Sequence, residues 1–382
     1  MKILKALFSS DYGMLGALLF LCIFFSFITY EQQQPVGEEG ANRLSEEIIE
    51  RFPVAGSVLI VGKKGVDGNA FVEGIRKRLT REGWEIRGGL TGGPSEFGRA
   101  MRNVFESNSS LDLVACEQFF AQLPVVENLR SSNPASREMR VMTPASYGWP
   151  NFLKASNLLN VANQIAVIAI LAIGMTFVII TAGIDLSVGS LIAFSAVLAT
   201  WTIREWTGGV DASVFGMIVG CLLAMLACGG LGLFSGAMVA YFSVPPFVAS
   251  LGMMMVASGL AYMLSGGLSV YQVPDSFEWL GRGDDLGGIP NAVTLMAILY
   301  LAAHLLMSRT TMGRHVYAVG GNPEAARLSG VPVKRILLWV YASSAVLAGL
   351  GGIVMASQFR SGDPKYGLMY ELYVIAAVVV GG

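Results

Sequence analysis

Residues 163–201 read NQIAVIAILAIGMTFV (163–178), IITAGIDLSVGS (179–190) and LIAFSAVLATW (191–201). Asp185 is the only charged residue between Lys154 and Arg204. A transmembrane helix needs about 20 mainly apolar residues, and such a run lies on each side of Asp185. A lone carboxylate is costly in hydrocarbon and normally faces a protein interior or a water-filled path. The stretch therefore predicts a polytopic membrane protein in which Asp185 either lies in a capped turn at the membrane surface or lines a translocation path.

The composition supports a membrane protein. Hydrophobic residues make up 53% of the 382 residues and charged residues only 14%, against roughly 25% charged residues in soluble proteins. The net charge of -1 gives no reason to expect nucleic acid as a partner. His304 and His315 lack the close spacing of metal ligands, so we expect no metal site. Cys221 and Cys228 share a helical face in an apolar run and are expected to pack.

Several apolar runs are long enough to span a membrane. They cover 13–30, 160–182, 187–204, 213–241, 244–266, 291–308 and 336–357, with a final run from 371. The first run follows Lys2 and Lys5 and could be a secretory signal. We expect an uncleaved anchor at 1–30, because the run is long and TYEQQQP offers no small-residue cleavage site.

Short loops give the expected orientation, because lysine and arginine favour the cytoplasmic side. Residues 309–335 carry five basic residues against one acid, whereas residues 267–290 carry one basic residue against four acids. The first loop is expected inside and the second outside. Counting spans backwards then puts the N-terminus inside and residues 31–154 outside.

Residues 31–154 hold 31 of the 53 charged side chains, which predicts a separate domain in water. Between residues 57 and 142, β-rich runs alternate with amphipathic stretches, a pattern typical of a parallel three-layer α/β unit. The glycines after the first run fit neither a P-loop nor a dinucleotide fingerprint. The basic run 76–81 is interpreted as the solvated face of a helix.

From VLIVGKKGVDGNAFVEGIRKRL to SSLDLVAC, this segment resembles one lobe of a periplasmic sugar-binding protein. Such proteins close two lobes around a ligand, and only one lobe is recognisable here. The resemblance therefore implies a docking or regulatory platform rather than a complete ligand site.

Four further motifs follow in order: NLLNVANQIAVIAILAIGMTFVIITAGIDLSVGS, VPPFVASLGMMMVASGLAYMLSGG, GRHVYAVGGNPEAARLSGV and ELYVIAAVVVGG. Together they resemble the permease subunit of ribose-type (monosaccharide) ABC importers over residues 152–382. The resemblance implies a channel subunit that works with a second permease copy, a separate ATP-binding subunit and a periplasmic substrate-binding protein. It implies no cofactor on this chain, since ATP is used by the partner. It also implies a multi-pass protein of the bacterial inner membrane with residues 31–152 on the periplasmic side.

The loop from Gly320 to Val331 resembles the coupling helix that fits into a cleft of the ATPase. Asn322 is a plausible N-cap, Pro323 occupies the first helical position, and Gly330 is a stop signal. The small residues are interpreted as suited to close packing on the partner. The residues assigned to this coupling loop are Gly320, Gly321, Asn322, Pro323, Glu324, Ala325, Ala326, Ser329 and Gly330.

Other polar or helix-breaking residues are candidates for the substrate pathway or for gating. Asn163 and Gln164 lie near the outer end of a span, where they could meet a sugar hydroxyl or another helix. Pro245 and Pro246 could serve gating or simply make a turn. Asp185, Ser187 or Ser190 could cap the helix that begins near residue 187. The pathway candidates are Asn163, Gln164, Asp185, Ser187, Pro245 and Pro246.

The sequence thus predicts an α-helical polytopic membrane protein with an inserted extracytoplasmic α/β domain. The expected parts are an anchor helix at 1–30, the insertion at 31–152 and a permease domain at 153–382. Relatives continue beyond the final VVVGG, so we expect a partial sequence. The alternative is a membrane-anchored ligand sensor, although the longest inside segment leaves little room for an output domain. An enzyme is not expected, because spacing pairs no nucleophile with a base and an orienting acid.

Overall fold

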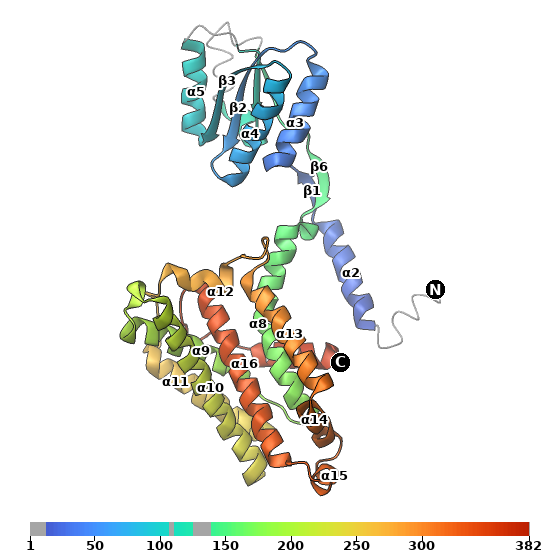
Figure 1. The fold of residues 1–382 in the computed structure, drawn as a ribbon, viewed down its shortest axis with the longest axis vertical. Coiled ribbons are helices and arrows are strands. Elements are labelled where there is room, and N and C mark those ends of the chain that lie inside the picture. Colours follow the sequence, from blue (N-terminus) through green and yellow to red (C-terminus); the bar gives the residue numbers. More distant parts are fainter. Residues whose placement is uncertain (1–12, 107–110, 125–138, 382) are drawn as a thin grey trace, which may run out of the picture. The chain divides into compact units, whose positions relative to one another are not determined.

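The computed structural model of the chain describes residues 13–106, 111–124 and 139–381 (Figure 1). These residues divide into an α/β unit, within Phe20–Lys154, and a helical unit from Ala155 onward. The division cuts helix α2 (Gly13–Ile28) at Leu19. Each unit has its own hydrophobic core, so each is described by itself.

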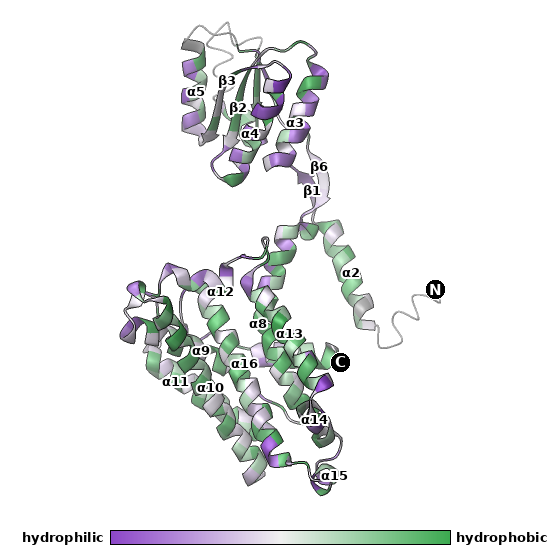
Figure 2. Ribbon diagram, in the orientation of Figure 1, coloured by the Kyte–Doolittle hydropathy of each residue, from purple (hydrophilic) through white to green (hydrophobic). Residues whose placement is uncertain are grey.

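The helical unit contains long apolar helices joined by short segments (Figure 2). In chain order, the α-helices of this unit, short ones included, are α8 (Ala155–Ile180), α9 (Val188–Trp206), α10 (Val214–Phe242), α11 (Pro246–Ser265), α12 (Trp279–Arg282), α13 (Asn291–Arg309), α14 (Thr311–Gly321), α15 (Pro323–Leu328), α16 (Val333–Phe359) and α17 (Tyr370–Gly381). Among the described residues, α8, α10, α11, α13 and α16 are long and apolar enough to cross a membrane. The shorter apolar helices are Gly16–Ile28 and α17.

Helix α9 differs from the expected span at 187–204. It does form a helix over this run, but Arg204 and Glu205 at its end reduce its hydropathy. Most of its residues are buried inside the unit, between α10, α11 and α16. It is therefore an internal helix surrounded by the more lipophilic ones.

Small residues allow the helices to approach closely, as the sequence predicts. A Cβ atom on Gly232 would lie 2.4 Å from the Cβ of Ala345, and one on Gly352 would lie 2.4 Å from the carbonyl oxygen of Ile192. Ser195 also donates a 2.6 Å hydrogen bond to the carbonyl of Gly349. These contacts fix α16 against both α9 and α10.

The α/β unit contains a parallel sheet in the order β3-β2-β4-β5, as expected. Its elements are α3 (Gly37–Arg51), β2 (Ser57–Lys63), α4 (Val66–Arg81), β3 (Glu85–Gly92), α5 (Pro94–Glu106), β4 (Leu113–Cys116), α6 (Gln118–Ala121) and β5 (Arg140–Met142). Strand β2 shows why three layers form. Val58 and Ile60 pack against α3 and α4, whereas Leu59 and Val61 pack against α5 and α6.

Two elements of this unit were not predicted. Helix α3 covers the sheet beside α4, and β1 (Tyr30–Gln33) pairs antiparallel with β6 (Tyr147–Pro150) in a separate two-stranded ribbon. Residues 117–130, the last of the amphipathic stretches expected between residues 57 and 142, lie partly outside the described residues. Its described part forms only the short α6.

Candidate functional site

The linker 181–187 joins α8 to α9 around the carboxylate of Asp185. Helix α8 ends where Ala182 takes a left-handed conformation, with φ of 58°. The N–H of Gly183 then donates a 2.9 Å hydrogen bond back to the carbonyl of Val178, which satisfies one of the last carbonyls of the helix. The chain therefore leaves α8 in a compact turn and enters α9 at Val188.

Asp185 is buried, with 2% of its surface exposed, and accepts three hydrogen bonds. Its Oδ1 accepts from the N–H and the hydroxyl of Ser187, at 3.0 and 2.6 Å. Its Oδ2 accepts from the hydroxyl of Ser344 on α16, at 3.0 Å. The carboxylate therefore ties the linker to a helix that is distant in sequence.

The expectation that Ser187 caps α9 with its side chain is wrong. Ser187 occupies the N-cap position but makes no side-chain cap bond, because its hydroxyl donates to Asp185 instead. Asp185 is also not an exposed surface turn of the helical unit, since its side chain is enclosed by protein.

Pro245 and Pro246 lie at the same end of the helical unit as Asp185. Pro245 is the N-cap residue of α11 and Pro246 its first residue, so this pair makes the turn after α10. Ser250, one turn into α11, donates a 3.3 Å hydrogen bond to the carbonyl of Ile184. The second turn is therefore hydrogen-bonded to the linker of Asp185.

Residues 310–332 also reach this end. A Cβ atom on Gly320, in the last turn of α14, would lie 1.9 Å from the carbonyl oxygen of Ile180. Only glycine allows α14 to approach the end of α8 this closely. The loop predicted to couple to the ATPase is thus in direct contact with the start of the linker.

Helix α15 forms as the sequence predicts. Its first turn is capped by Asn322, whose Oδ1 accepts from the N–H groups of Glu324 and Ala325, both at 3.0 Å. Pro323 is its first residue, and Gly330 follows its end with a φ of 86°. Arg327 holds the pKa of the exposed Glu324 below its usual value, through an ion pair of 2.6 Å.

The surface of α15 differs from the sequence interpretation. Ala326 was expected to face a partner, but only 5% of it is exposed, and it packs against the chain's own core. Ala325 and Ser329 are exposed, and the prominent apolar side chain is Leu328, with 78% exposed. Leu328 was missed because a leucine beside small residues gives no sequence signal of exposure.

Asn163 and Gln164 are not close to Asp185. They lie near the start of α8, about 25 Å from its end by helical rise. Asn163 donates a 3.1 Å hydrogen bond to the carbonyl of Gly281, while its own Oδ1 is buried without a partner. Gln164 is exposed. The pathway candidates therefore form two groups at opposite ends of the unit.

The same end as Asn163 carries an apolar cavity of about 760 Å³ between α10, α12 and α16. Its lining includes Met217, Leu222 and Ile353, with few polar atoms such as the hydroxyl of Ser276. A sugar needs several hydrogen-bonding groups around it, and this cavity offers few. The lining favours hydrocarbon over a sugar.

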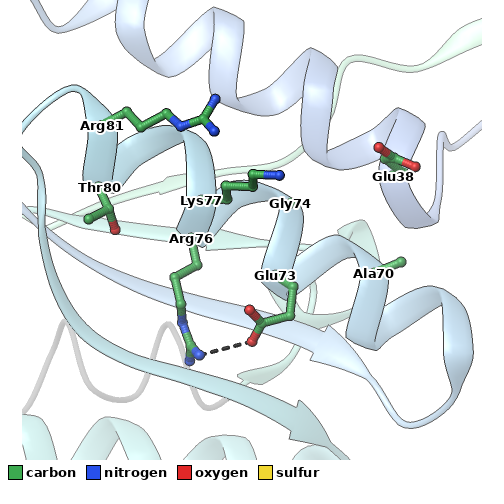
Figure 3. A pocket seen from close by; sticks show the side chains of 8 residues that line it. All are labelled: Glu38, Ala70, Glu73, Gly74, Arg76, Lys77, Thr80 and Arg81. Carbon is green, nitrogen blue, oxygen red and sulfur yellow. Dashed lines mark hydrogen bonds and ion pairs between the residues drawn. The ribbon is translucent and has the colours of Figure 1, made fainter.

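A second pocket, of about 730 Å³, lies on the α/β unit beside α3 and α4 (Figure 3). Glu73 forms an ion pair with Arg76 at 2.9 Å in its wall. The other lining residues are Glu38, Ala70, Gly74, Lys77, Thr80 and Arg81. Charges of both signs on an open surface agree with the solvated helix face predicted from the sequence.

The carboxyl edge of the sheet holds a buried acid. Glu117, directly after β4, is 6% exposed, and its backbone N–H donates a 3.3 Å hydrogen bond to the carbonyl of Val61 on β2. Burial raises the pKa of Glu117, and it raises that of the neighbouring Cys116 thiol to about 12. The Lys63 ammonium lies 5.1 Å from the ring centre of Phe119. No group of three metal-ligating side chains occurs among the described residues of the chain.

The comparisons with known proteins agree with this architecture. The sequence pattern of the family described as branched-chain amino acid transport system / permease component matches residues 157–382. The ribose import permease protein RbsC of Escherichia coli (strain K12) is 41% identical over 241 residues, which cover 61% of this chain and 71% of that protein.

Two further relatives extend the comparison. The RbsC protein of Bacillus subtilis (strain 168) is 37% identical over 61% of this chain and 70% of its own length. The galactose/methyl galactoside import permease protein MglC of Salmonella typhimurium is 34% identical over 61% of this chain and 72% of its own. No solved structure matches the chain. The chain therefore belongs to this family of membrane permease components, among the permeases of ABC sugar importers.

Proposed function

We propose that the chain is the permease subunit that carries a ribose-like monosaccharide into the cytoplasm, driven by ATP hydrolysis on a separate subunit. The similarity to ribose and galactoside import permeases over most of the helical unit supports this assignment. The chain itself holds no cofactor in this scheme. Its partners are an ATP-binding subunit, a second permease copy and a periplasmic substrate-binding protein.

The orientation follows from the two ends of the helical unit. Linker 181–187, turn 243–245 and loop 310–332 share one end, and the basic residues of 309–335 gather there. Acidic residues gather in 267–290, where Asp275 and Glu278 both pair with Arg360. Because basic loops favour the cytoplasm, the end with α15 lies inside and the α/β unit lies in the periplasm.

The single observation that carries the coupling role is the exposed capped helix α15 in contact, through its loop, with the linker of Asp185. An ATPase that binds the exposed Leu328 side chain would move α15 and, with it, α14. Gly320 passes that movement to Ile180, at the end of α8. From there the linker and its Asp185–Ser344 bond transmit it to α16, so two long helices move together.

At the outer end, the polar group available to a sugar is the buried carbonyl oxygen of the Asn163 side chain. It has no partner among the described residues. A buried acceptor without a donor is unfavourable, and a sugar hydroxyl would relieve it. Asn163 therefore belongs to the entry of the pathway, whereas Asp185 belongs to its gate.

The α/β unit serves as a docking platform for the substrate-binding protein. It has the layered architecture of one lobe of a periplasmic sugar-binding protein, in the order β3-β2-β4-β5. The strand order reverses between β2 and β4, the position where open α/β sheets bind ligands. Here the buried Glu117 directly follows β4 and its backbone N–H bonds to Val61 of β2, which favours docking over a complete ligand site.

Changing Leu328 to Asp tests the coupling role. We expect normal membrane abundance, because the side chain is exposed, but loss of co-purification with the ATP-binding subunit and loss of labelled ribose uptake. Leu268→Asp is the matched control, since Leu268 is 75% exposed at the end of the unit with the acidic loop. Unchanged uptake and co-purification for Leu328→Asp would show that α15 does not receive the ATPase.

A further inference from the structure

The hydroxyl of Tyr341 is an unexplained group in the interior of the helical unit. Tyr341 lies on α16, is 1% exposed and is among the largest fully buried side chains of the described residues. Its hydroxyl is buried without a hydrogen-bond partner there. Because an unsatisfied buried hydroxyl is unfavourable, its presence calls for a reason beyond packing.

The surroundings of this hydroxyl point to the linker. A Cβ atom on Gly183 would lie 2.6 Å from the Tyr341 hydroxyl oxygen, so the hydroxyl touches the linker two residues before Asp185. Asp185, two residues further along this linker, carries the only charge of residues 181–187. It is therefore the charged acceptor closest in sequence to the point where the hydroxyl meets the linker.

In this structure the Asp185 carboxylate accepts a hydrogen bond from Ser344, which lies on the same helix, α16, as Tyr341. Ser344 lies three residues after Tyr341, and residues with this spacing share one face of a helix. The two residues thus follow each other along α16, with their Cα atoms separated by about 4.5 Å of helical rise. The Ser344 hydroxyl donates to Asp185, whereas the Tyr341 hydroxyl has no hydrogen-bond partner among the described residues.

We propose that Tyr341 is the second hydrogen-bonding position of Asp185, occupied in another state of the transport cycle. In the present state the carboxylate binds Ser344. When the linker shifts by less than one helical turn towards the N-terminal end of α16, the carboxylate leaves Ser344 and accepts from Tyr341. Tyr341 is thereby a positioning residue for transport, acting through Asp185.

The packing around Tyr341 makes the linker the moving part. Two glycines of α10 hold the backbone of α16 closely: Cβ atoms on Gly232 and Gly236 would lie 2.6 Å from the Tyr341 carbonyl oxygen and 3.2 Å from its Cβ. The linker, by contrast, begins directly after Ile180, against which Gly320 of α14 packs. That loop 310–332 moves the linker, and in which direction, rests on the proposed coupling role of this loop.

The experiment uses the full chain reconstituted with its ATP-binding subunit. Tyr341→Phe removes only the empty hydroxyl, and Ser344→Ala removes only the occupied one. Melting temperatures are measured without nucleotide and in the complex trapped with ATP and vanadate. We expect Ser344→Ala to melt lower only without nucleotide, and Tyr341→Phe to melt lower only in the trapped state. Each hydrogen bond should shift the occupancy of its state by roughly fivefold to tenfold.

Ser235→Ala is the matched control, because Ser235 on α10 also has a buried hydroxyl without a partner. It should lower neither melting temperature. Tyr341→Phe should lower ribose uptake severalfold at normal membrane abundance, and should have no further effect in an Asp185→Asn background.

Two results would overturn the proposal. One is a lower melting temperature of Tyr341→Phe without nucleotide, which would reveal a partner already present, such as a bound water. The other is an unchanged trapped state with unchanged uptake. If Leu328→Asp leaves coupling intact while Tyr341→Phe destabilises the trapped state, the role of α15 fails and this inference stands.

Discussion

Replacing Gly320 by Ala places one methyl group between α14 and the end of α8. Its carbon would lie 1.9 Å from the carbonyl oxygen of Ile180, whereas ordinary contacts begin at 3.4 Å. The backbones must therefore separate by about 1.5 Å, and overpacking of this kind costs about 1–3 kcal/mol. Alanine recovers at most ~1 kcal/mol of helix propensity in the last turn of α14. The net loss therefore lies between about 0 and 3 kcal/mol.

Gly321→Ala is an internal control one residue further along, where an added Cβ meets nothing within 4 Å. We expect Gly321→Ala to match the unmodified protein, and Gly320→Ala to melt lower and to transport ribose more slowly. Melting temperature of the purified chain, membrane abundance and uptake by the reconstituted importer check this. If both alanine variants melt and transport alike, the contact between Gly320 and Ile180 carries neither stability nor coupling.

Three further predictions follow from the same geometry. Asp185→Asn keeps the shape but removes the charge that accepts three hydrogen bonds; we expect uptake to fall at normal abundance, and normal uptake would leave the carboxylate a structural link only. A cysteine at the exposed Glu82, in a chain without its native cysteines, should react with a membrane-impermeant reagent in cells with a permeabilised outer membrane; labelling only after lysis of the inner membrane would reverse the orientation. Residues 30–154 alone should fold. Burial raises the pKa of Glu117, so the folded state binds the Glu117 proton more tightly than the unfolded state does. The free energy of unfolding should therefore fall as pH rises from 4.5 through the raised pKa. Glu117→Gln should abolish this slope in chemical unfolding, and a slope retained in full would assign it to other groups.

The sequence predicts the helical unit well because hydrocarbon demands long apolar runs. It also predicts α15, since an N-cap, a proline and a glycine stop are local signals. Helix α3 was overlooked although its signal was present: Ala41, Leu44 and Ile48 recur at helical spacing and form its buried face. The ribbon of β1 and β6 has no such signal, because YEQQ and YGWP lack apolar alternation.

The candidate site was predicted only in part, because its partners are far apart in sequence. Asp185 stands out as a lone charge, but nothing near it indicates Ser344, 159 residues away. The buried side of α15 was also hidden, since Ala326 faces a core built from α8, α14 and α16. Local patterns thus identify elements and isolated charges, while the contacts between helices decide which face of each element is free.

The antiparallel ribbon has a consequence for how the α/β unit is connected to the rest of the chain. Tyr30 pairs with Pro150 and Gln33 with Tyr147, so the chain departs and returns about 4.8 Å apart, as in the stem of a hairpin. Everything between these strands is topologically the loop of that hairpin, however large its fold. A gene segment encoding such a unit can enter or leave a permease without separating the residues on either side. The stem thus allows such a unit to be added or removed with little change to the chain on either side.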